Sequence, residues 1–108
     1  MKSKESLVFL GMMGSGKSSI GLIISKKLDI EFVDIDKEIE KKIGSTITKI
    51  FENKGEKFFR EVEEVTTLNI LKKNKMVISL GGGAFLNKKI RKEILENHIS
   101  FWLKWKDE

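Results

Sequence analysis

The first residues that could do chemistry form a glycine-rich run near the start of the chain. Gly11, Gly16, Lys17 and Ser18 match the pattern G-x-x-x-x-G-K-[ST]. Glycines let backbone N–H groups approach phosphate oxygens, a lysine adds a cation, and a serine hydroxyl can ligate Mg²⁺. The run therefore predicts a phosphate loop that holds ATP and a magnesium ion. A glycine-rich turn without a ligand is the alternative.

A pair of carboxylates follows further along the chain, at Asp34 and Asp36. Two carboxylates two residues apart could assist Mg²⁺ and accept a hydrogen bond or a proton from a substrate hydroxyl. The alternative is that Asp36 only caps the helix that begins there. The spacing alone leaves both interpretations open.

Arg60 lies in a helical pattern whose apolar stripe includes Phe58, Val62 and Val65. The stripe places Arg60 off the core face, where its guanidinium could fork onto a carboxylate ligand. Glu63 or Glu64, one turn on, could orient it. An intrahelical ion pair on the surface is the alternative.

Three successive glycines, at 81–83, follow an apolar run. At the end of a strand, such a run suggests a backbone held close to a ligand, with N–H groups available for an anion. A flexible loop is the alternative.

These residues must be positioned by strands and helices that alternate along the chain, which is the pattern of βαβ units and a parallel sheet. Strands are expected at 7–10, 31–35, 76–80 and 99–103. In open sheets of this kind, ligands bind beyond the carboxyl ends of the strands. All of the polar features above follow predicted strands or belong to the helices between them.

The helices between the strands are predicted from apolar residues at three- and four-residue spacing. Gly44 and Gly55 are expected to end helices, and Ser45 and Asn87 to cap them. The residues expected to face inward are Ile20, Ile23, Ile24, Leu28, Phe58, Val62, Val65, Leu68, Leu71, Ile90 and Ile94.

Together, the phosphate loop, the D-x-D, the F-R-x-x-E and the G-G-G resemble shikimate kinase in their order and spacing, over about residues 7–105. The resemblance implies an α/β fold of three layers, the P-loop kinase fold, with a parallel sheet and helices on both faces. It also implies transfer of the γ-phosphate of ATP to the 3-hydroxyl of shikimate, in aromatic amino-acid biosynthesis.

The resemblance assigns roles to individual residues. ATP would be held by Gly14, Ser15, Gly16, Lys17, Ser18 and Ile20. Mg²⁺ would be bound by Ser18 and Asp34. Shikimate would be bound by Asp36, Arg60, Gly81, Gly82 and Gly83, with Lys17 and Asp36 as the catalytic residues.

We expect residues 1–108 to be a single domain of this kind, without the C-terminal lid and final strand that the resemblance implies. The strand at 99–103 would then expose an apolar edge, with Phe101, Trp102 and Trp105 losing part of their cover. Marginal stability or self-association would follow. We expect the full-length protein to be a monomer.

Composition and charge argue against a nucleic-acid-binding protein and a membrane-spanning protein. The net charge is +5, but the lysines are spread along the chain and mostly alternate with glutamates, which is unlike a nucleic-acid surface. No apolar run is long enough to span a membrane, and the chain has no cysteine. We expect a cytoplasmic protein with small-molecule partners, and His98 as a surface residue.

Three other functions stay open from the sequence. One is a P-loop kinase for another small hydroxylated substrate, such as gluconate or a nucleoside monophosphate. Another is a nucleotide-binding remnant that does not transfer phosphate. A nucleic-acid-binding module is the third, and it would need a clustered basic face.

Overall fold

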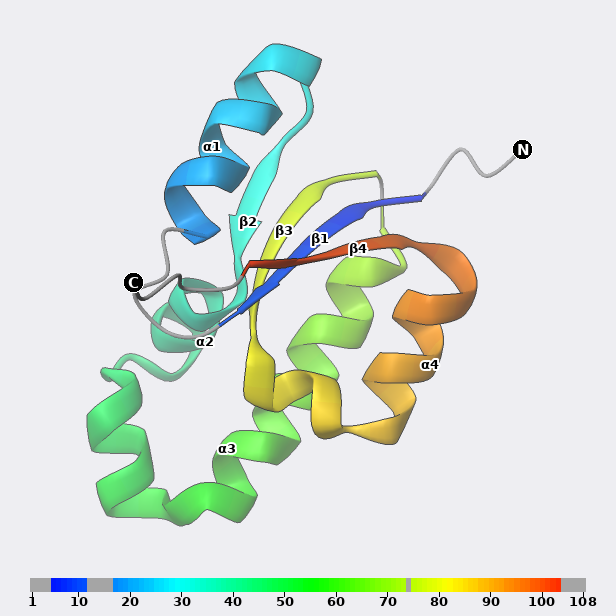
Figure 1. The fold of residues 1–108 in the computed structure, drawn as a ribbon. Helices are drawn as coiled ribbons and strands as arrows, with labels where there is room; N and C mark the ends of the chain where they lie inside the picture. The colour runs from blue at the N-terminus through cyan, green and yellow to red at the C-terminus, as the bar shows by residue number, and fades with distance from the viewer. Residues whose placement is uncertain (1–4, 12–16, 74, 104–108) are drawn as a thin grey trace, which may run out of the picture.

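The computed structural model describes residues 5–11, 17–73 and 75–103. Its centre is a four-stranded parallel sheet in the order β2-β3-β1-β4 (Figure 1). The strands are β1 (Leu7–Gly11), β2 (Phe32–Asp34), β3 (Val77–Gly81) and β4 (Ile99–Leu103). All four predicted strands are present; β4 has the predicted ends, and the ends of the others differ by at most one residue.

Helices cover both faces of this sheet (Figure 1). They are α1 (Lys17–Leu28), α2 (Ile35–Ile43), α3 (Ile47–Leu71) and α4 (Lys88–Asn97), with a short 3₁₀ helix η1 (Gly82–Leu86) after β3. α1 lies on one face, and α2, α3 and α4 lie on the other. The predicted three-layer α/β architecture is confirmed.

The main core lies between the sheet and the layer formed by α2, α3 and α4. Alternate residues of β1 and β3 point into this layer, as the two-residue period of a strand requires. Fully or almost fully buried side chains here are Val8, Leu10, Ile35, Ile39, Ile50, Ile78, Leu80, Ile90 and Ile94. The inward orientation predicted for Ile90 and Ile94 is confirmed.

The other face is less completely covered, and here the prediction for α1 was wrong. Ile20, Ile23 and Leu28 were expected to face inward, but each is exposed. The helix instead approaches the sheet through Gly21, where an added Cβ would lie 2.6 Å from Cε1 of Phe32. Close approach through glycine replaces the apolar stripe as the contact.

In helix α3, the spacing of apolar residues predicted the buried face only in part. Gly55 has φ 88° and ψ 167° and breaks the helix into two segments, as predicted. In the second segment the buried side chains include Phe59 and Glu63, whereas Val65, predicted to be inward, is exposed. The inward orientation of Leu71 is confirmed, and Phe58, Val62 and Leu68 are half-buried against the core. The covered face is therefore wider than the apolar stripe and lies toward Phe59 and Glu63, away from Val65.

The caps of the helices follow ordinary local chemistry. Gly44 is left-handed at φ 81° and ends α2, and the side chain of Asn87 accepts the backbone N–H groups of Lys89 and Ile90 at the start of α4, both as predicted. Thr46, not Ser45, caps α3, because its Oγ1 accepts the N–H of Lys49 at 3.2 Å.

His98 is buried, which corrects its expected place on the surface. Its side chain is 2% exposed, and its Nδ1 accepts the backbone N–H of Ser6 at 2.9 Å. Because Nδ1 is an acceptor, Nε2 carries the hydrogen and donates it to Glu93 Oε2 at 3.0 Å. The ring therefore joins the start of β1 to α4 and β4 at the amino end of the sheet.

β4 is an edge strand with large exposed side chains. Ile99, Phe101 and Trp102 are all exposed, although Phe101 stacks on Phe9 with ring centroids 5.0 Å apart. The predicted exposure of Phe101 and Trp102 is confirmed, and Trp105 lies outside the described residues. A membrane-spanning helix needs about 20 apolar residues, and none of the described helices meets that requirement.

Candidate functional site

The carboxyl ends of β1 and β3 meet at the centre of the sheet. Gly11 pairs in register with Gly81, and a Cβ on Gly82 would lie 3.6 Å from the carbonyl oxygen of Gly11. The helices that follow these two neighbouring strands, α1 and α4, cover opposite faces of the sheet. Connections that diverge from adjacent strands open the crevice in which ligands of α/β proteins bind.

The phosphate-loop motif begins at this crevice, because its first residue, Gly11, is the last residue of β1. Gly14, Ser15 and Gly16 lie outside the described residues, and Lys17 and Ser18 begin α1. Ile20 follows in the first turn of that helix and is exposed. An anion at the loop would therefore face the N-terminal end of α1, where the helix dipole is positive.

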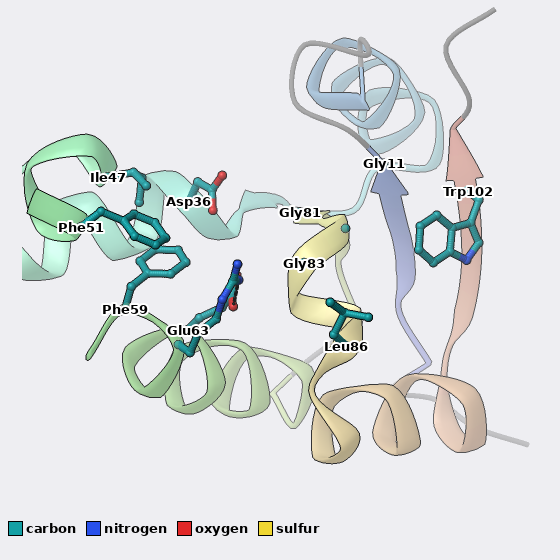
Figure 2. Close-up of a pocket in the computed structure, with 12 residues that line it drawn as sticks. Gly11, Asp36, Ile47, Phe51, Phe59, Glu63, Gly81, Gly83, Leu86 and Trp102 are labelled. Carbon is teal, nitrogen blue, oxygen red and sulfur yellow. Dashed lines mark hydrogen bonds and ion pairs between the residues drawn. The ribbon is translucent and has the colours of Figure 1, made fainter. Parts of the chain in front are cut away.

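A pocket of about 620 Å³ opens beside this crevice. Figure 2 shows its residues converging from α2, α3, the start of η1 and β4. They are Gly11, Asp36, Ile47, Phe51, Phe59, Arg60, Glu63, Gly81, Gly82, Gly83, Leu86 and Trp102. The pocket brings together Asp36, Arg60 and the whole glycine run, which the sequence had singled out separately.

The two aspartates have different places. Asp34 ends β2 and is the N-cap of α2, with Oδ1 accepting the N–H of Lys37 at 3.3 Å. Asp36 lies in the first turn of α2 and lines the pocket. The alternative in which Asp36 is the cap was therefore wrong: Asp34 caps the helix, and Asp36 is left to face the pocket.

Arg60 is held by two carboxylates of its own helix. Its Nη1 donates to Glu63 Oε1 at 2.7 Å, and its Nε lies 3.5 Å from Glu56 Oε2. The side chain of Glu63 is 4% exposed, whereas that of Arg60 is 38% exposed. The pair is intrahelical, as one alternative held, but its buried carboxylate orients the guanidinium at the edge of the pocket rather than on an open surface.

Glu63, not Glu64, is thus the orienting carboxylate. Glu64 points to another partner, accepting a hydrogen bond from Nδ2 of Asn87 at 2.8 Å and pairing with Lys89 at 3.6 Å. This contact ties α3 to the start of α4. The two neighbouring glutamates therefore serve different interfaces.

Burial affects the pKa values of Arg60 and Glu63 differently. Desolvation raises the pKa of Glu63 above its ordinary value, the charge of Asp36 raises it further, and Arg60 opposes both. Desolvation lowers the pKa of Arg60, but hydrogen bonds and charges from Glu63 and Glu56 outweigh it and leave that pKa raised. The guanidinium is firmly cationic, and the cost of burial falls on the carboxylate.

The glycine run approaches Arg60 directly. A Cβ on Gly83 would lie 2.8 Å from Nη2 of Arg60, so only glycine leaves the guanidinium its present position. Gly81 ends β3, and Gly82 and Gly83 begin η1. The run is therefore not the flexible loop of the alternative but a strand end followed by a 3₁₀ turn packed against the guanidinium.

The apolar side of the pocket was not identified as a site from the sequence. The sequence did not single out Ile47, Phe51 or Phe59 as site residues, and it placed Trp102 only at the exposed sheet edge. Phe51 and Phe59 lie with ring centroids 4.8 Å apart and form one wall. Nothing in the spacing of these residues separates a pocket wall from an ordinary core stripe, so no local signal could have found them.

The arrangement combines a phosphate loop, a firmly charged guanidinium, a carboxylate and an apolar wall at one edge of a parallel sheet. Such a site can hold a small polar acid beside the phosphates of a nucleotide. Fold and site together define a protein of the P-loop kinase class.

Comparison with known proteins defines the family. A family model described as shikimate kinase matches residues 13–108. A shikimate kinase of Bartonella quintana is 48% identical over 101 residues, which are 94% of this chain and 48% of that protein. The chain belongs to the shikimate kinase family.

Solved structures agree with this assignment. A shikimate kinase from Acinetobacter baumannii in complex with shikimate superposes with a TM-score of 0.88 and 34% identity, over 94% of this chain and 57% of that one. A gluconokinase from Sinorhizobium meliloti, at 18% identity and a TM-score of 0.55, shares the fold alone. The chain spans about half the length of the relatives that it matches.

Proposed function

We propose that this protein transfers the γ-phosphate of ATP to the 3-hydroxyl of shikimate, a step of aromatic amino-acid biosynthesis. The observation that carries the proposal is the ion pair of Arg60 and Glu63, whose Nη1 and Oε1 atoms are 2.7 Å apart. The pair lies against Gly83, in a pocket that Asp36 also lines. The family to which the chain belongs and its likeness to a shikimate-bound structure support it.

The substrate side of the site suits a hydroxylated carboxylic acid. The guanidinium of Arg60 can donate two parallel hydrogen bonds to a carboxylate, and backbone N–H groups of Gly81, Gly82 and Gly83 can add to them. The carboxylate of Asp36 can accept a hydrogen bond from a ring hydroxyl and take its proton as that hydroxyl attacks. Phe51 and Phe59 would cover the hydrocarbon ring.

The nucleotide side would be supplied by the phosphate loop and the start of α1. Backbone N–H groups of Gly14, Ser15 and Gly16 would surround the phosphates, and Lys17 would neutralise charge on the transferring group. Ile20 would contact the nucleotide from the first turn. Phosphoryl transfer depends mainly on such positioning and charge stabilisation.

Magnesium fits the oxygen donors present. Mg²⁺ prefers one or two oxygen ligands from protein, together with substrate phosphates and several waters. Asp34 is an anionic oxygen donor at the carboxyl end of β2, and Ser18 contributes a hydroxyl. Bound there, the ion would neutralise charge on the phosphates. We assign Ser18 as a ligand and Asp34 as its support.

We further propose that residues 1–108 form one domain and that the protein acts in the cytoplasm, where ATP is the phosphoryl donor. Its partners would be ATP and shikimate, without nucleic acid or membrane. A monomer suffices for this chemistry, because every residue named above comes from one chain.

The test is shikimate-dependent release of ADP from Mg-ATP by the 108-residue chain. Turnover that needs shikimate, is abolished in Lys17→Ala and is kept in Lys26→Ala, in the exposed last turn of the same helix, would support the proposal. ATP binding without shikimate-dependent release would instead indicate a nucleotide-binding protein that does not transfer phosphate. Turnover with gluconate but not shikimate would indicate another kinase of this class.

A further inference from the structure

The turn between α2 and α3 is closed at both ends by one residue, Glu40. Its backbone carbonyl accepts the N–H of Gly44 at 2.8 Å and that of Ser45 at 3.3 Å, which ends α2. Its carboxylate Oε2 accepts the N–H of Ile47 at 2.9 Å, across seven residues. Glu40 therefore both ends one helix and begins the next.

The contact with Ile47 is well suited to fix the start of α3. The first N–H groups of a helix lack partners within the helix, and the positive end of its dipole favours a carboxylate. Thr46 satisfies the N–H of Lys49 from within the same helix end. The bond from Ile47 to Glu40 reaches back to α2 and adds a polar tether to the apolar packing between the two helices.

This turn carries one side of the pocket. Asp36 lies four residues before Glu40 on α2, and Ile47 and Phe51 lie in the first two turns of α3. All three line the pocket. Beyond Phe51 the helix breaks at Gly55, where φ is 88° and ψ is 167°. The backbone of the second segment, which bears Arg60, therefore does not hold the first segment in line.

We propose that Glu40 is a positioning residue, which sets the Ile47–Phe51 wall relative to Asp36 and so tunes affinity for the acid bound in this pocket. The proposal rests on the proposed function for the identity of that acid. Without the tether, Ile50 in the core and Phe51 on Phe59 would still hold the middle of the first segment. Its first turn, which bears Ile47, would be less firmly set relative to Asp36.

The experiment uses the 108-residue chain and reads two quantities, amide hydrogen exchange at Ile47 and the dissociation constant for shikimate. Glu40→Ala removes the acceptor, and we expect faster exchange at Ile47. We also expect roughly tenfold weaker binding, because ordering the start of α3 would then oppose binding. Glu40→Gln keeps an acceptor oxygen at the same reach and is expected to restore both quantities nearly to wild type.

Two matched variants separate positioning from general loss of stability. Glu38→Ala removes a carboxylate of α2 that lies 3.8 Å from Nζ of Lys41 on the same helix, and we expect it to change neither quantity. Thr46→Ala removes the other cap of α3, and we expect faster exchange at Lys49 with unchanged shikimate affinity. A role confined to helix stability would make Thr46→Ala and Glu40→Ala equally harmful to binding.

The outcomes are distinct. Unchanged exchange at Ile47 in Glu40→Ala would overturn the tether, and faster exchange with unchanged affinity would overturn the positioning role. Equal losses of affinity in Thr46→Ala and Glu40→Ala would overturn it as well. A wild-type chain that does not bind shikimate would overturn the proposed function, while exchange at Ile47 would still decide whether the tether exists.

Discussion

The guanidinium of Arg60 and the backbone of Gly83 adjoin so closely that a Cβ on Gly83 would lie 2.8 Å from Nη2 and 3.1 Å from Nη1. The same guanidinium donates to Glu63 at 2.7 Å on its other side. Arg60 is therefore confined between a carboxylate and a glycine. Its orientation depends on both.

Gly83→Ala should displace the guanidinium of Arg60 from Glu63 without unfolding the chain, because the clash is with the end of a flexible side chain. We expect shikimate to bind roughly tenfold more weakly, as loss of one hydrogen bond to a charged group implies. The unfolding free energy should fall by about 1–3 kcal/mol, because the buried carboxylate of Glu63 loses its hydrogen-bond partner. Calorimetric titration and urea unfolding measure the two quantities.

Gly81→Ala is the matched control for Gly83→Ala. A Cβ on Gly81 meets nothing within 4 Å, so the pair of Arg60 and Glu63 should stay in place. If both alanine variants reduce the affinity for shikimate equally, the loss results from replacing a glycine of this run by alanine, and not from the clash with Arg60.

Glu63 should make the unfolding free energy depend on pH, with a sign that follows from its raised pKa. Burial raises its pKa above the ordinary 4.5, so at a pH between the unfolded and the folded pKa the folded chain binds more protons than the unfolded chain. The stability that this provides is fully present below pH 4.5 and is lost as the pH rises through the raised pKa. Urea unfolding between pH 4 and 7 should therefore show Glu63→Gln gaining stability relative to wild type as the pH rises.

Glu64→Gln provides a comparison of opposite sign on the adjacent residue. The hydrogen bond from Asn87 lowers the pKa of Glu64, and Lys89 adds to this. Its contribution to stability is present above pH 4.5 and is lost as the pH falls through the lowered pKa. A Glu63→Gln variant that loses stability relative to wild type as the pH rises would show that pairing with Arg60 outweighs desolvation.

His98 should contribute to stability through the hydrogen bond that its ring accepts. His98→Leu leaves the buried N–H of Ser6 without that acceptor, and we expect the unfolding free energy to fall by about 1–3 kcal/mol. His98→Asn can present Oδ1 near the position of Nδ1 and should lose less. Urea unfolding at one fixed pH distinguishes them, and equal losses would show that packing of the ring, not its acceptor, matters.

Local chemistry made much of the fold predictable. Gly44 can adopt a left-handed conformation, Asn87 can accept two N–H groups at a helix start, and Gly55 interrupts a helical run. Each effect acts over a few residues, so each can be predicted from adjacent positions. The parallel arrangement of the strands followed from their alternation with helices.

The choice between neighbouring residues required the tertiary structure. Whether Glu63 or Glu64 orients Arg60 depends on a rotation of about one residue, and the spacing of apolar residues does not define a helix face that finely. Whether Asp34 or Asp36 caps α2 depends on the residue at which that helix begins. Similarly, Ile23 and Val65 fit apolar stripes yet are exposed. Which face is covered is decided by the elements that pack against it.

By itself, the sequence determined the order of strands and helices, the phosphate loop, and the polar residues that parallel strands would bring to one edge of a sheet. Only the tertiary structure decided how these residues meet: that Glu63 is buried beneath Arg60, that Gly83 confines the guanidinium, and that Phe51 and Phe59 close the pocket. The physical reason is that a motif is defined by neighbouring residues in the sequence. Burial and side-chain contacts depend on segments that are distant in the sequence and meet only in the folded chain.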